Sequence, residues 1–94
     1  MDIFIPKTFQ LFGHTFKVVQ PPKVDAQKSL GECNSSTNII KLRRSLKKES
    51  KEQVYLHELV HAILDSLSYD ELSDDEVFVD QFSKALHQIL KSSK

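Results

Sequence analysis

The sequence lacks several features that would place it in a specialised class of protein. Its 94 residues include one cysteine, Cys33, which excludes an intramolecular disulfide framework and favours a reducing cytoplasm as its compartment. No apolar run approaches membrane-spanning length, and the first residues lack the basic region and long apolar stretch of a signal peptide. Thirteen basic and 13 acidic residues give zero formal net charge, so composition alone does not favour nucleic acid or an anionic membrane as a partner. We therefore expect residues 1–94 to form one small cytoplasmic domain.

The stretch His57-Glu-Leu-Val-His61 matches the pattern H-E-x-x-H. Residues four apart lie on one face of a helix, so both histidines can direct a ring nitrogen at one Zn²⁺. Glu58 lies about 100° round the helix from His57, because a turn contains 3.6 residues. That position is beside the ion but not on it, as a general base for a zinc-activated water requires. Two ordinary helix histidines beside a core are the alternative interpretation.

The residues around the motif predict an amphipathic helix over about 51–67. Ser50 to Gln53 has the pattern of a capping box that would open this helix. Apolar residues then recur at helical spacing, with their centre about a quarter turn from the two histidines. They are Leu56, Val60, Ile63 and Leu67, flanked by Leu59 and Leu64. The two histidines are therefore expected along the border of a buried stripe.

The first 42 residues favour β-structure. Four segments rich in β-branched or aromatic residues, or flanked by turn formers, are predicted strands: Phe9–Phe12, Thr15–Val19, Gly31–Cys33 and Asn38–Leu42. Gly13-His14 is the predicted turn between the first two, and Val24–Leu30 is a candidate short helical turn. We expect an α+β fold, with a three- to four-stranded, mainly antiparallel sheet over about 3–42. His14 is expected at the surface, and Cys33 is expected to pack rather than react.

The segment from Lys41 to Lys51 is basic. One interpretation is a patch for nucleic acid or an acidic partner, and the other is a solvated linker between sheet and helix. Glu49 interrupts the run, Glu52 follows it, and no aromatic residues are interleaved for base stacking. The linker is favoured, and no nucleic-acid partner is expected.

A second helix is predicted over about 74–91, after a connection at Ser68–Ser73. Its apolar face comprises Phe78, Val79, Phe82, Ala85, Leu86, Ile89 and Leu90. A second stripe at the edge of that face comprises Glu76, Asp80, Ser83 and His87. Two adjacent antiparallel helices could bring their ligand-capable stripes together.

Catalytic zinc usually has three protein ligands, and four residues are candidates for the third. Asp65 lies about 12 Å along the axis from His57, which suits a surface or supporting role better. Glu76 is favoured because it lies in the first turn of the second helix, but Ser73 to Glu76 is also a possible capping box. Asp80, one turn on, suits an acceptor for a ligand histidine N–H. His87 lies about 16 Å from Glu76, too far to share the ion.

These motifs together resemble the gluzincin metallopeptidases. H-E-x-x-H on one helix and Glu-x-x-x-Asp on the next, here Glu76 to Asp80, carry the resemblance. It is similar to small ImmA/IrrE-type enzymes and short phage-encoded zincins, and covers roughly residues 31–90. It implies a zincin-like fold, zinc ligands His57, His61 and Glu76, Glu58 as base, and Asp80 supporting the ligands. Asp80 stands where the small members have Asn.

The leading functional hypothesis is zinc-dependent hydrolysis of peptide bonds in a peptide or protein substrate. A sheet edge could hold that substrate as an added strand. Tyr55, Tyr69 and His87 are candidates for stabilising the oxyanion, and none is placed by the sequence. The alternative is a non-catalytic zinc-binding module that interacts with a partner protein.

Overall fold

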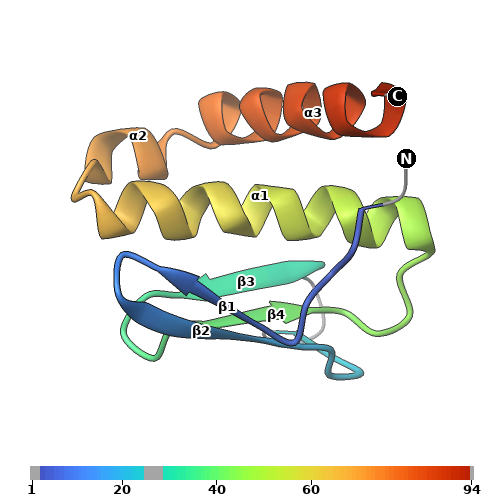
Figure 1. The fold of residues 1–94 in the computed structure, drawn as a ribbon, viewed down its shortest axis with the longest axis horizontal. Helices are drawn as coiled ribbons and strands as arrows, with labels where there is room; N and C mark the ends of the chain where they lie inside the picture. Colours follow the sequence, from blue (N-terminus) through green and yellow to red (C-terminus); the bar gives the residue numbers. More distant parts are fainter. Residues whose placement is uncertain (1–2, 25–28, 94) are drawn as a thin grey trace.

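The computed structural model describes residues 3–24 and 29–93, so most of the predicted turn at Val24–Leu30 lies outside the described residues. The strands are β1 (Thr8–Leu11), β2 (His14–Val19), β3 (Gly31–Asn34) and β4 (Ile39–Leu42), followed by the helices α1 (Lys48–Ser66), α2 (Asp70–Asp74) and α3 (Glu76–Ser92). The sheet, α1 and α3 form three successive layers (Figure 1). The predicted α+β class is confirmed, and α1 is the middle layer.

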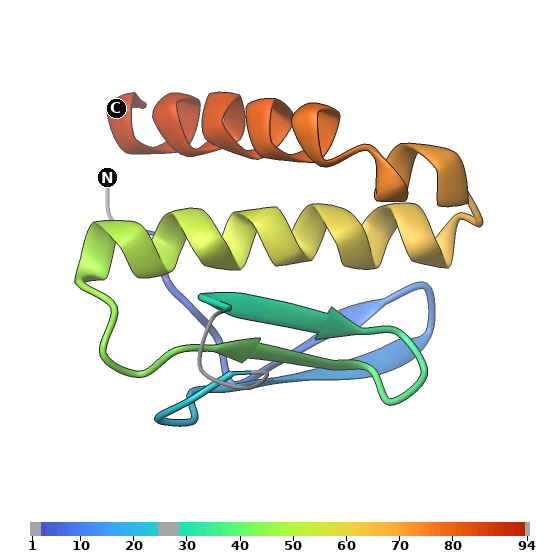
Figure 2. The same ribbon diagram turned by 180° about the vertical axis from the view of Figure 1, so that it is seen from behind.

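The sheet has the strand order β1-β2-β4-β3 and is mixed. Two pairs are antiparallel: β1 pairs with β2, and β3 pairs with β4. The central pair is parallel, with Lys17 opposite Ile39 and Val19 opposite Lys41. The sheet is mainly antiparallel, as expected, but its central pair is parallel. After β2 the chain first forms β3 at the edge and then returns to place β4 between β2 and β3. This topology leaves β3 at an edge, beside α1 (Figure 2).

The first hairpin turns one residue earlier than predicted. Phe12 and Gly13 both have positive φ, 49° and 81°, whereas the sequence pattern indicated Gly13-His14. Two successive residues with positive φ are typical of the tight I′ turn that suits twisted antiparallel strands. His14 therefore begins β2, and its side chain is exposed as expected.

The main core lies between the sheet and α1. Alternate strand residues face the helix, which follows from the period of two along a strand. Phe16, Val18, Ile40 and Leu42 are buried there against Tyr55, Leu56 and Ala62 of α1. A second, smaller core joins α1 to α3 through Val60, Leu64 and Val79. Instead of one buried stripe, α1 thus buries residues on both sides.

The predicted capping box at Ser50 is wrong, and the alternative one at Ser73 does not form either. α1 begins at Lys48, and its N-cap residue Lys47 makes no side-chain cap, so Ser50 lies inside the helix. The predicted connection at Ser68–Ser73 contains most of α2. α3 is capped by Asp75, whose side chain accepts a hydrogen bond from the Phe78 N–H at 3.0 Å. No helix among the described residues is long and apolar enough to cross a bilayer.

A buried carboxylate ties the end of α3 to the start of α1. Glu52 is 1% exposed, and its Oε1 lies 3.2 Å from Nε2 of His87 and 3.1 Å from Nζ of Lys91. Its other oxygen accepts a hydrogen bond from the Ile3 N–H at 3.4 Å. Burial would raise the pKa of Glu52, but these hydrogen bonds outweigh it and lower the pKa below its ordinary value. The carboxylate therefore holds three segments together as an anion.

Candidate metal centre

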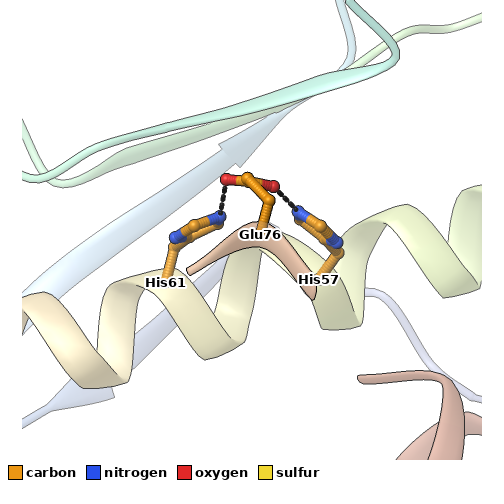
Figure 3. A group of neighbouring side chains, drawn as sticks. All are labelled: His57, His61 and Glu76. Atoms are coloured by element: carbon orange, nitrogen blue, oxygen red, sulfur yellow. Dashed lines mark ion pairs between the residues drawn. The ribbon is translucent and has the colours of Figure 1, made fainter. Parts of the chain in front are cut away.

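The two histidines of α1 converge on a carboxylate from the start of α3. Nε2 of His57 lies 3.3 Å from Oε2 of Glu76, and Nε2 of His61 lies 3.1 Å from its Oε1 (Figure 3). The histidines can do this because they are one helical turn apart on the same face of α1. Glu76 can do this because it is the first residue of α3. The short helix α2 turns the chain back, so that α3 packs on α1. The arrangement brings together the three residues that the sequence favoured.

The other ring nitrogen of each histidine also has an oxygen neighbour. Nδ1 of His61 lies 3.0 Å from the hydroxyl of Ser73, and Nδ1 of His57 lies 3.6 Å from Oδ1 of Asp80. Such outer contacts fix the orientation of a metal-ligating imidazole and leave Nε2 directed at the ion. The role proposed for Asp80 is compatible with its position. Ser73 was not expected here, because no spacing in the sequence predicts how α2 folds back.

A neighbouring lysine stabilises the charged form of Asp80. Nζ of Lys84, one turn further along α3, lies 2.9 Å from Oδ2 of Asp80. The hydrogen bond and positive charge of Lys84, together with His57, lower the pKa of Asp80. Asp80 therefore remains an anion that can accept from an imidazole N–H.

The donor set fits a zinc ion. Two imidazole nitrogens and one carboxylate oxygen, the ligand types of a catalytic zinc site, all lie within 4.8 Å of one another. Ligand atoms about 2.0–2.1 Å from a tetrahedral zinc stand about 3.3 Å apart. The two nitrogen–oxygen distances in the structure are similar, each to a different oxygen of Glu76. With only three protein ligands, such a site keeps a position open for water or substrate.

Glu58 lies beside this group and is 8% exposed. Its side-chain stem packs against β3, where a Cβ added at Gly31 would stand 3.3 Å from Cγ of Glu58. Burial, with smaller effects from the charges of Glu76 and Glu32, raises the pKa of Glu58 to about 7. A cation bound at the histidines would oppose that shift, because it favours the carboxylate form. Glu58 is thus held in place as a carboxyl group able to exchange a proton.

An open cleft of about 480 Å³ exposes these groups to solvent. Its walls come from the start of β3, from α1 and from the first turns of α3. The residues that line it are Ser29, Leu30, Gly31, Gln53, Val54, His57, Glu58, His61, Glu76 and Asp80. The cleft is therefore large enough for part of a peptide.

Other candidates from the sequence lie outside the cleft. His87 contacts Glu52, and Asp65 lies on the far part of α1, beside a separate surface hollow near the β1–β2 turn. Tyr55 is buried in the main core, and Tyr69 is 56% exposed at the start of α2. None of the three residues considered for the oxyanion lines the cleft, so the structure leaves that role unassigned.

Cys33 packs against the main core, as expected. Burial, with smaller effects from Glu58, Asp65 and Glu32, raises the pKa of its thiol to about 12. The thiolate is the reactive form of cysteine, so this side chain remains an unreactive thiol at neutral pH.

Comparisons of the chain with protein-family models, with curated proteins and with solved structures found no match.

Proposed function

We propose that this protein is a zinc-dependent metallopeptidase of the gluzincin type. The observation that carries the proposal is the convergence of His57 and His61 on Glu76. Their outer ring nitrogens lie next to Asp80 and Ser73, and their Nε2 atoms are left facing Glu76. An isolated ion pair would not need this second set of contacts, whereas a metal site does.

In the proposed reaction, a bound zinc ion would supply Lewis-acid polarisation of the scissile carbonyl and a more acidic water. Glu58 would accept the proton of that water and return it to the leaving amine. Its suitability rests on its place in the cleft and on the packing that holds its stem against β3. His57, His61 and Glu76 would hold the ion, and Asp80 and Ser73 would orient the two imidazoles.

The substrate is proposed to bind as an added strand on β3. The Arg43 N–H donates to the Leu30 carbonyl, so the alternation of an antiparallel ladder turns the peptide groups of Gly31 and Cys33 away from β4. These groups face the open edge of the sheet, and Gly31 also lines the cleft. An extended peptide could hydrogen-bond along this edge and pass beside Glu58.

The test combines metal analysis with a peptide cleavage assay. His57→Ala and His61→Ala should lose stoichiometric zinc and melt at a lower temperature, because metal binding stabilises the folded state. Glu58→Gln should retain zinc and lose hydrolysis of a peptide library. Full zinc content in both histidine variants would exclude this site, and an active Glu58→Gln would remove Glu58 from the mechanism.

A non-catalytic zinc-binding module that binds a partner protein is the second candidate. The observation that favours it is the absence of Tyr55, Tyr69 and His87 from the cleft, which leaves no assigned oxyanion donor. Wild-type protein that holds one zinc per chain but cleaves neither casein nor the library would support this candidate over the peptidase.

A further inference from the structure

The zero net charge of the chain conceals two halves of opposite sign. Residues 1–51 hold ten of the 13 basic and four of the 13 acidic residues, a formal charge of +6. Residues 52–94 hold the other three basic and nine acidic residues, a formal charge of −6. The first half forms the sheet and the start of α1, and the second forms the rest of α1 and the other helices. The molecule is therefore strongly polarised.

Two basic residues of the strands, Lys17 and Lys41, lie on the face of the sheet that no helix covers. In both views all three helices lie on one side of the sheet (Figures 1 and 2). The alternating burial of the strands turns Lys17 and Lys41 toward the other side. Their strands are paired, and Lys41 is opposite Val19, two residues beyond Lys17, so the two lysines are diagonal neighbours. Glu32, opposite Lys41 on β3, is the only acidic residue of these four strands.

The positive surface continues into the segment that joins β4 to α1. Arg44 donates from Nε to the Gln20 carbonyl at 3.1 Å, and Lys51 donates from Nζ to the Gln20 side-chain oxygen at 2.8 Å. Both acceptors are uncharged, so these contacts fix the two cations in place without neutralising them. We call the whole surface the basic face. It comprises Lys17, Lys41, Arg43, Arg44, Lys47, Lys48 and Lys51.

The helix dipole does not explain why lysines gather at the start of α1. The N-terminus of a helix favours acidic residues and its C-terminus favours basic ones, because of the helix dipole. Around the start of α1 stand three lysines, Lys47, Lys48 and Lys51, with one acidic residue, Glu49, and the last turn has no basic residue. The excess of positive charge at the start of α1 therefore does not follow from the helix dipole.

We propose that the basic face binds the phosphate backbone of double-stranded nucleic acid, without reading its sequence. The cations are spread over β2, β4, the connecting segment and the start of α1, as contact with a row of phosphates requires, although Lys48 and Lys51 also line a hollow beside Glu52. The outward residues beside them on β1 and β2 are Thr8, Gln10 and Thr15, whose side chains can also donate to phosphate oxygens, and the apolar Val19. The cores of protein interfaces are instead depleted of lysine and enriched in aromatics, and the outward strand positions here hold no aromatic residue. That same absence disfavours a single strand, whose bases need stacking partners.

The experiment is fluorescence anisotropy of the full chain with a labelled DNA duplex of about 20 base pairs, from about 50 to 200 mM salt. Five phosphate contacts would give a log–log slope of about −4.5, which is a loss of several hundredfold in affinity over that range. Lys17→Gln should make the slope shallower by about 1, and Lys17→Gln with Lys41→Gln by about 2. Lys84→Gln on α3 removes the same single charge from the helical side and is the matched control.

Three outcomes would overturn the proposal. The first is no binding tighter than about 10⁻⁴ M at the lowest salt, the weak limit of non-specific DNA binding. The second is an equal effect of Lys84→Gln and Lys17→Gln, because binding would then follow total charge and not this face. The third is competition by polyglutamate or single-stranded DNA as strong as competition by the duplex. Circular dichroism on each variant verifies that the fold is retained.

Discussion

Replacement of Gly31 by alanine tests how closely α1 must approach the edge of the sheet. A Cβ on Gly31 would overlap Cγ1 of Val54, and it would lie 3.1 Å from the Lys41 carbonyl oxygen and 3.3 Å from Cγ of Glu58. Two of these neighbours belong to α1 and one to the backbone of β4. The added methyl therefore cannot be accommodated by one flexible side chain, and α1 must move away from β3.

The expected cost follows from the number of contacts that must shift. Adding a methyl group to a filled site typically destabilises a protein by about 1–3 kcal/mol, and a backbone oxygen among the neighbours favours the middle of that range. A loss of about 2 kcal/mol corresponds to a fall in melting temperature of roughly 8–16 °C for a domain of this size. Because Glu58 moves with α1, peptide cleavage should fall more than zinc affinity does.

The assay is thermal unfolding of Gly31→Ala, Val54→Ala and the double variant. Val54→Ala removes the atom that the new methyl would strike, so the double variant should be more stable than the sum of the single effects predicts. A coupling of about 1 kcal/mol or more is expected for residues in direct contact. A Gly31→Ala protein as stable as wild type, or strictly additive effects, would refute the close approach.

Three further predictions concern the proposed metal site and the buried carboxylate. Competitive chelator titration should show a larger loss of zinc affinity for Glu76→Gln than for Asp80→Ala, because Glu76→Gln removes a charged ligand. Asp80→Ala should lower zinc affinity by about 10- to 100-fold. The reverse order would make Asp80 the ligand. Ser73→Ala should weaken zinc by about tenfold or more, because the imidazole it contacts loses its orientation, and unchanged affinity would count against that role. The lowered pKa of Glu52 means that its stabilisation is complete above the unfolded-state pKa and is lost as the pH falls through the folded-state value. The melting temperature of wild type should therefore fall more steeply below about pH 4.5 than that of Glu52→Gln, and parallel curves would exclude the contribution.

The parts of the site that depend on spacing within one helix could be predicted from the sequence. His57, Glu58 and His61 have their relative positions determined by the helical repeat alone. Glu76 could be favoured because it lies in the first turn of the second predicted helix, from which its side chain can reach back to the first. Ser73 could not be predicted, since its contact depends on α2, a five-residue helix with no periodic pattern. Its resemblance to a capping residue pointed to a different role.

The arrangement of the sheet was only partly predictable, for a related reason. Strand positions follow from local composition, and all four predicted strands fell within one residue of their observed bounds. The pairing of β2 with β4 depends on contacts between segments that are far apart in the sequence. The local residue pattern does not predict such contacts. The buried residues of α1 were also only partly predictable. This helix packs on the sheet at one side and on α3 at the other, so its buried residues do not form one apolar stripe. The capping boxes do not form because the true N-cap residues, Lys47 and Asp75, do not follow the capping-box pattern.

The position of α3 as an outer layer has a consequence for how long a metal would stay bound. α3 packs chiefly on α1, and it is joined to that helix near both ends, through Glu76 at its start and Lys91 at its finish. Release of an ion would free only the first of these ends, while Glu52 still anchors the other. The dissociation rate would then be governed by fraying of the first turns of α3, a local opening that needs far less free energy than global unfolding. In hydrogen exchange, amides just after residue 76 should gain protection on zinc loading, while those near residue 90 change little.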